Sequence, residues 1–529
     1  MYSPVAVWLV QKRLSLFITS VLVILGSLYG FSKLQYSSDY RVYFEKNNPQ
    51  LTAHENIQAT FSRSDNVLLV LAPQNGDSFT RENLAAVEWL TTEAWRLPYS
   101  QRVDSLTNFQ HTFVDGDDLY VEDLFSDAMN MDADTLAQRK QTALQEPLLL
   151  HRLISPSGHV SALNVEFNLP GDQTVGNQEV VAASRALRDN FMAKYPQFKV
   201  YLTGVVPLNN SFDEVARSDS STLMPIMMLV ILAMVGLMLR SVASTLITMT
   251  IIMVGVLATI GTTGLIGIGL NNINAVAPII IMTLAVADCV HILTHYLTAR
   301  RKGMDKEEAM TDAMDVNFNP VLLTSVTTIV GFLSMNSSDS PPLQTFGTIS
   351  AIGMFYTWLF SITMLPQLAL WFSRATPVID AEHGAFFNRL ADFVVRHPRK
   401  LFFIPMALAI FSFTFIDDNN LNDDNVGYFS KKIEIRQGSD FTEANLTGVN
   451  LIEYSLDTKQ ENGVSDPAFL QKVDAFAQWY RQQPEVTHVF VFTDTLKRLN
   501  QNMHGDDKAY YQLPESRELA SQYQLLYEM

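Results

Sequence analysis

The sequence predicts a polytopic α-helical membrane protein with α+β domains of β-α-β type outside the membrane. It also predicts a tandem parallel repeat whose second unit is truncated. Three observations support this class. Several apolar runs among the 529 residues are long enough to cross a bilayer. Two long polar segments interrupt these runs, and the second segment repeats features of the first.

Charge and apolarity are segregated along the chain: 48% of the residues are hydrophobic and 17% are charged, yet the net charge is -17. An acidic chain lacks the basic face that binds phosphates, which argues against a nucleic-acid partner. The single cysteine, Cys289, excludes an intramolecular disulfide and a zinc site built on paired thiolates. The chain has no G-x-x-x-x-G-K-[ST] motif for ATP. We therefore expect neither an enzyme nor a bound cofactor.

Seven apolar runs are predicted to cross ~30 Å of hydrocarbon at ~1.5 Å per residue. Backbone polar groups in hydrocarbon need internal partners, so each run is expected to be a helix. The runs are residues 14–31, 222–239, 245–268, 275–297, 318–335, 345–372 and the shorter 401–416. The first run lacks a small-residue cleavage site, which predicts a retained helix rather than a removed signal peptide.

Lys and Arg predict the orientation of these spans. The loops on one side are basic, whereas the short loops 269–274 and 336–344 hold no Lys or Arg. Short cytoplasmic loops keep positive charge, so the N-terminus is predicted in the cytoplasm. The long polar segments are then outside the membrane.

The predicted domains follow from this topology. Residues 1–33 form the cytoplasmic N-terminus and first span, 34–221 an outer α+β domain, and 222–372 a bundle of five spans. Residues 373–400 form a cytoplasmic linker, 401–416 the seventh span, and 417–529 a second, incomplete outer domain. Within the linker, residues 386–395 carry their apolar side chains on one helical face, which predicts a helix on the bilayer surface.

The first outer segment predicts two β-α-β units. Its β-rich runs alternate with stretches of helical periodicity. The predicted strands are 66–72, 103–106, 159–169 and 198–204, and the predicted helices are 79–97, 134–152 and 178–195.

The second outer segment repeats the first at an offset of about 385 to 390 residues. The motif at 39–44 recurs at 424–429, the strand 66–72 at 450–456, and the strand near Val103 at 489–492. One span, one outer domain and five spans thus form a unit, and the second unit stops early. We expect a fragment or truncated gene product that does not transport by itself and whose partner is the missing C-terminal repeat. Parallel repeats are typical of transporters.

Three features of the sequence resemble the RND superfamily. They are the order of elements, the run LAVADCVHILTHY around Asp288, and the run NPVLLTSVTTIVGFLSM in the next span. The modest outer domains are most similar to MMPL-like hydrophobe and lipid exporters, and spans two to six also resemble a sterol-sensing domain. The resemblance implies porter-like outer domains in the periplasm and proton-driven export of hydrophobic or amphiphilic cargo, lipids in particular, through a bacterial inner membrane. It also implies that the fourth-span acid acts with partners in a tenth span. Asp288 is followed by Cys289, where close relatives have an Asp-Tyr pair. A homo-oligomer of this protein is one further arrangement that the sequence allows.

Asp288 is the strongest site candidate, because an acid inside a span costs ~2.5 to 3.5 kcal/mol to insert and normally faces a protein interior or an aqueous path. His291 and His295 follow at i+3 and i+7, on the same predicted face. We predict a proton relay at Asp288, assisted by His291, Thr324 and Thr328. A metal site on the acid and histidines is the less favoured alternative.

The hydroxyls of the fifth span have a second interpretation. Thr324, Ser325, Thr327 and Thr328 could reach Asp288, or they could bond to carbonyls of their own helix. The glycines in and next to the third span predict close helix packing; they are Gly255, Gly261, Gly264, Gly267 and Gly269.

Two functions from other classes remain as alternatives. One is a sterol-sensing-like receptor that binds lipid without pumping, and the other is an auxiliary component of protein translocation like SecD and SecF. Asp288 favours a pump over a receptor. A seventh span and a second outer domain on the same chain disfavour a SecD-like half.

Reporter fusions test the orientation. Fusions at Arg240 and Lys302 should report cytoplasm and fusions at Gly116 and Gly463 the opposite side, because short basic loops stay inside. A cytoplasmic reporter at Gly116 would contradict the topology and the export hypothesis with it.

Overall fold

The computed structural model describes residues 2–37, 40–45, 47–61, 65–115, 118–170, 173–373, 383–416, 419 and 424–528. Asp39 of the repeat motif, Gly116 of the fusion test and part of the predicted linker lie outside these residues. The chain forms two compact units. The helical unit comprises Met1–Lys46 and Val215–Asp424, and the sheet unit comprises Asn47–Glu214 and Asn425–Met529.

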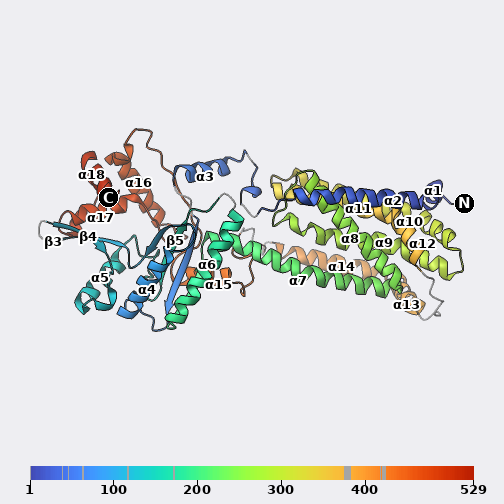
Figure 1. The fold of residues 1–529 in the computed structure, drawn as a ribbon, viewed down its shortest axis with the longest axis horizontal. Coiled ribbons are helices and arrows are strands. Elements are labelled where there is room, and N and C mark those ends of the chain that lie inside the picture. The colour runs from blue at the N-terminus through green and yellow to red at the C-terminus, as the bar shows by residue number, and fades with distance from the viewer. Residues whose placement is uncertain are drawn as a thin grey trace. The chain divides into compact units, whose positions relative to one another are not determined.

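Six helices in the described part of the chain are long and apolar enough to cross a membrane (Figure 1). They are α2 (Arg13–Leu28, continued by a 3-10 turn), α7 (Val205–Leu239), α8 (Val242–Leu265), α9 (Ala277–Arg301), α10 (Lys306–Leu333) and α11 (Pro341–Thr363). The first six predicted apolar runs each fall within or across these helices. A short helix, α1 (Pro4–Gln11), precedes α2.

The sixth predicted span is not one helix. α11 ends at Thr363 and α12 (Leu365–Phe372) begins after Met364. Pro366 lacks an N–H and its ring crowds the carbonyl four residues earlier, so a continuous helix through this point is disfavoured. The expectation of a single helix over 345–372 is wrong in this respect.

The predicted linker and seventh span are also helical where they are described. α13 (His383–Arg396) includes the predicted surface helix and exposes Leu390, Phe393 and Val394. α14 (Pro398–Phe413) has 16 residues, as many as α2, whereas a 3-10 turn extends the first span to 21 residues. Membrane crossing by α14 and bilayer contact by α13 stay predictions.

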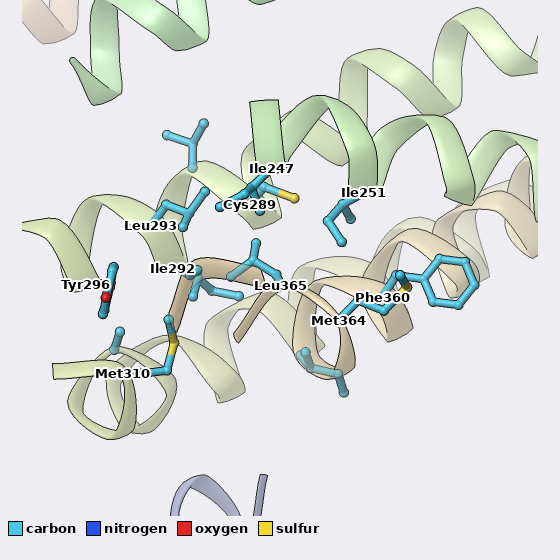
Figure 2. Packing of buried hydrophobic residues seen from close by; sticks show 14 of the residues in the cluster. Ile247, Ile251, Cys289, Ile292, Leu293, Tyr296, Met310, Phe360, Met364 and Leu365 are labelled. Carbon is cyan, nitrogen blue, oxygen red and sulfur yellow. The ribbon is translucent and has the colours of Figure 1, made fainter. Parts of the chain in front are cut away.

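The helical unit packs around α8, α9 and α11. Figure 2 shows Cys289 and Ile292 of α9 among Ile247, Ile251 and Leu365. Glycines permit a close approach of α8 to the end of α2: a Cβ on Gly261 would lie 2.2 Å from the Ser27 carbonyl oxygen. The close packing predicted from the α8 glycines is therefore confirmed at this contact.

The sheet unit contains a four-stranded antiparallel sheet of order β2-β5-β1-β6. Its strands are β1 (Asn66–Pro73), β2 (Ser100–Ser105), β5 (Ser161–Phe167) and β6 (Phe198–Thr203). α4 (Arg81–Ala94) connects β1 to β2, and α6 (Gln173–Lys194) connects β5 to β6. Each connection skips over one antiparallel strand, which makes two split β-α-β units. The two predicted β-α-β units are thus confirmed.

Alternating side chains give the sheet two buried faces. Val67, Leu69 and Leu71 of β1 contact a cluster that includes α4 and α6. Val70 points into a second cluster, which holds Phe79, Leu106 and several apolar residues between Leu124 and Ile154. This second cluster also contains Leu446 from the segment after the helical unit.

A β-hairpin and a shorter helix differ from the predicted elements. β3 (Gln110–Asp115) pairs with β4 (Asp118–Asp123), and α5 (Ala133–Gln145) ends before the predicted helix 134–152 does. The sequence carries a signal for this hairpin, because the dipeptide Gly-Asp between two strand-like runs is typical of a two-residue turn. His111 belongs to this hairpin.

The second polar segment contains helices and, within 424–528, no strand. Its helices are α15 (Glu434–Asn445), α16 (Pro467–Arg481), α17 (Phe492–Asn502) and α18 (Arg517–Glu528). The strands expected at 450–456 and 489–492 are therefore wrong. Their counterparts β1 and β2 both pair with β5, and this segment offers no described equivalent of β5 to supply hydrogen bonds.

α15 packs against β6. Thr203 Oγ1 lies 2.8 Å from Ser439 Oγ, and the rings of Tyr201 and Phe441 stack with centroids 4.1 Å apart. Glu434 pairs with both Arg185 and Arg188 of α6. This helix thus contributes to the second face of a sheet formed from the first polar segment.

α17 contacts the hairpin through buried charge. Arg498 pairs with Glu146, whose side chain is 4% exposed, and donates to Nδ1 of His111 at 3.3 Å. Burial, and then the charges of Arg498 and Arg139, lower the pKa of His111 to about 4. His111 is therefore a neutral acceptor near pH 7.

Gly438→Ala should loosen α15 from the sheet. A Cβ at residue 438 would lie 2.1 Å from the Leu202 carbonyl oxygen, so the helix must move away, at a cost of about 1 to 3 kcal/mol. Hydrogen exchange of α15 and β6 should speed up. Gly448→Ala is the matched control, since its nearest atom would be the Thr487 hydroxyl at 3.4 Å. Equal exchange in the two variants would contradict this packing.

Candidate functional site

The candidate site lies on α9. Asp288 is the twelfth residue of this apolar helix and is 3% exposed. Ser325 Oγ of α10 donates to its Oδ2 at 3.2 Å, and Ser325 is itself 1% exposed. The pair joins two consecutive helices inside the bundle.

Helical periodicity explains why Ser325 faces Asp288. Val321 and Ser325 are one turn apart and both are buried, so they share the inner face of α10. Thr324 and Thr328 lie away from this buried face: Thr324 is exposed and Thr328 is half-buried. Their hydroxyls donate to the carbonyls of Pro320 and Thr324, at 2.9 and 2.8 Å.

The structure therefore supports the second interpretation for these two threonines. Neither donates to Asp288, whereas Ser325, from the same group of hydroxyls, does. A part for Thr324 or Thr328 in proton transfer stays a prediction without a contact to support it.

The two histidines of α9 diverge from the acid. His291 is exposed although Asp288, three residues earlier, is buried. His295 is half-buried, and its Nε2 lies 2.8 Å from Asp312 Oδ2 on α10. Within the described residues, no three His, Cys, Asp or Glu side chains converge as metal ligands would.

α9 and α10 thus meet at two polar contacts, Asp288 with Ser325 and His295 with Asp312. Seven residues of α9 separate the contacts, or about 10 Å along the helix. Sequence reasoning did not identify Asp312, because it belongs to the polar start of α10, ahead of the predicted span. The helix actually begins at Lys306.

Cys289 lies outside the polar pair. It is 1% exposed and packs with Ile247 and Leu293 in the apolar cluster (Figure 2). Its position next to Asp288 in sequence turns it toward a different neighbour, as the ~100° step between helical residues requires.

Comparison with known proteins supports a transport family. The profile of the MMPL family matches residues 43–401, which include α9 and α10. A putative membrane protein of Methanocaldococcus jannaschii is 27% identical over 173 residues, 33% of this chain and 45% of that protein. The siderophore exporter MmpL5 of Mycobacterium tuberculosis is 24% identical over 319 residues, 58% of this chain and 33% of its own length.

A third relative, the hopanoid transporter HpnN of Rhodopseudomonas palustris, is 28% identical over 99 residues, 19% of this chain and 11% of its length. The chain thus spans less than half the length of these relatives. The family match nevertheless extends over most of the chain and includes five of the six long helices. The protein, an integral membrane protein by its apolar helices, belongs to the MMPL family of transporters within the RND superfamily.

Proposed function

We propose that the protein exports hydrophobic or amphiphilic molecules, lipids in particular, driven by proton entry through a bacterial inner membrane. The observation that carries the proposal is Asp288, an acid buried inside a membrane-crossing helix with a serine as its hydrogen-bond donor. Acids at such positions are typical of proton and ion pathways. Membership of a transporter family supports the same class of function.

The carboxyl group would couple proton binding to helix contacts. As a carboxylate it accepts the hydrogen bond from Ser325; as a neutral acid it also gains an O–H to donate. A proton crossing 100 mV supplies ~2.3 kcal/mol, which is comparable to the roughly 1.5 to 3 kcal/mol of a hydrogen bond to a charged group. The entry of one proton therefore has the magnitude needed to exchange this contact between α9 and α10.

The names of two relatives support the cargo class. A siderophore exporter and a hopanoid transporter both match this chain. Since those relatives are longer, we propose the activity for a protein with a complete second repeat. The basic-loop pattern supports a periplasmic location for the sheet unit.

Asp288→Asn should abolish proton-coupled export while leaving folding and insertion intact, because it keeps the shape and removes titration. In cells with the full-length gene product, Nile red efflux after re-energisation should fall to the level of empty cells. A protonophore should do the same to the parent. Asp339→Asn, which changes an exposed loop acid, should export normally. Parental efflux from Asp288→Asn would make Asp288 a structural group.

Ser325→Ala should destabilise the helical unit by about 1 kcal/mol, because it removes the donor to a buried acid. Thr324→Ala is the control and should change stability by less than about 0.5 kcal/mol, since Thr324 is exposed and bonds only to its own helix. Unfolding by dodecyl sulfate in mixed micelles measures both. Equal losses would show that Ser325 contributes no more than a bond to its own helix does.

A further inference from the structure

The contact between His295 of α9 and Asp312 of α10 differs from the Asp288 contact in its access to water. The His295 side chain is 35% exposed and the Asp312 side chain 26%, whereas Asp288 is 3% exposed. The pair lies towards the basic end of α9, which is the end predicted to face the cytoplasm. It therefore joins the same two helices as the buried acid, but at a place that water reaches.

The rotation of α9 explains why His295 rather than His291 contacts α10. At about 100° per residue, His295 lies only about 20° from the direction of Asp288, whereas His291 lies about 60° from it. His291 is exposed, and Nε2 of His295 lies 2.8 Å from Asp312 Oδ2. Asp288 and His295 thus belong to one stripe of α9 that faces α10.

Apolar side chains separate the two contacts. Ile292 of α9 is 1% exposed and lies among the apolar residues of the bundle (Figure 2). Met314 and Val321 of α10 are also buried between the contacts. Asp288 and His295 are about 10 Å apart along the helix, so a proton cannot pass directly, and apolar side chains offer it no site. A proton on Asp288 therefore leaves in this direction only when α9 and α10 separate enough to admit water.

The groups around the pair on α10 are acidic. Glu308 and Asp315 lie four residues before and three residues after Asp312, on the same side of the helix. Desolvation, and then the charges of Asp312, Glu308 and Asp315, raise the pKa of Tyr2, so the N-terminal segment lies near these acids. α8 and α11, which also pack on α9, contain no Asp, Glu, Lys, Arg or His. The pair thus lies next to the counter-charges that an imidazolium requires.

Two arginines at this end of the helices have other acceptors. Arg13, at the start of α2, pairs with Glu307 at 2.7 Å. Arg300 of α9 donates to the Met304 carbonyl oxygen. Neither takes the place of the imidazole at Asp312.

The imidazole of His295 has the two nitrogens that a proton relay requires. Its Nε2 contacts the Asp312 carboxylate, which is an acceptor only, so Nε2 carries the hydrogen. Nδ1 is then the acceptor of the neutral ring. Asp312 is a positioning residue, because its hydrogen bond selects this tautomer and orients the ring.

We propose that the His295–Asp312 pair takes up the proton that Asp288 releases and passes it to the cytoplasm. The Asp288 carboxyl group loses the proton and becomes a carboxylate, and Nδ1 of His295 gains the proton through the admitted water. The imidazolium then gives one proton to cytoplasmic water, which restores the neutral ring. This inference rests on the proposed proton-driven export and adds a second titrating group to it.

Proton entry through the full-length gene product tests the relay. Proteoliposomes driven by a potassium diffusion potential, at equal pH on both sides, report the entry rate from about pH 5 to 8, the range in which histidine changes charge. The parental rate should fall towards the acidic end, because the imidazolium then keeps its proton. His295→Gln keeps an N–H donor for Asp312 but cannot titrate. It should slow entry by about 10²-fold, the low end for a positioned proton-transfer group, and flatten the pH profile.

Two further variants separate failure of the relay from failure of the export proposal. Asp288→Asn should block proton entry, and parental entry in this variant would contradict proton-driven export and the relay with it. His397→Gln is the matched control, since the ring of His397 bonds to the Phe393 carbonyl in the predicted linker, and it should match the parent. A parental rate and pH profile in His295→Gln, with Asp288→Asn blocked, would overturn the relay alone. Equal loss in His397→Gln would also overturn it.

The tautomer of His295 gives a readout that does not need transport. NMR of the chain in lipid nanodiscs, labelled with heavy nitrogen at histidine, should show the hydrogen of the neutral ring on Nε2. Asp312→Glu should keep this tautomer, whereas Asp312→Asn should mix the two, because its amide can also donate a hydrogen. A parental ring with its hydrogen on Nδ1 would overturn the proposal, whether or not the His295→Gln variant folds.

Discussion

Backbone N–H and C=O groups need hydrogen-bond partners wherever water is excluded, and both units of the protein obey this constraint. In the helical unit each long apolar segment satisfies its own backbone as a helix. In the sheet unit β1 is flanked by β5 and β6, which satisfy it from both sides. The segment at 450–456 has similar residues but no such neighbours among the described strands, and it remains irregular.

The same constraint explains which features the sequence predicts well. Hydropathy locates the membrane helices because the bilayer leaves few alternatives, but it does not define their ends. α10 starts at Lys306, well before its apolar part, and the helix break next to Pro366 divides a run that has no charged residue. Strands were predicted reliably only in the first segment, because a strand depends on partners that its own residues do not encode.

The site shows a further limit of sequence reasoning. Asp288 can be recognised from the sequence without knowledge of its neighbours, since an acid in an apolar run is unusual. Its partner does not, because Thr324, Ser325 and Thr328 are chemically alike and only the rotation of α10 selects Ser325. His291 had a favourable spacing, but a step of three residues was enough to move it from the buried to the exposed side of α9.

The packing of α15 on β6 has a consequence for synthesis on the ribosome. β6 ends at Thr203 and α15 begins at Glu434, so about 230 residues are translated between them. At roughly 5 to 20 residues per second this interval lasts about 10 to 50 s. Throughout it, Tyr201 and the backbone of Leu202 in β6, which is an edge strand, lack the helix that packs on them, and an uncovered strand edge is a template for wrong pairing. The nascent chain therefore has a defined period in which a chaperone can protect this edge or a neighbouring chain can occupy it.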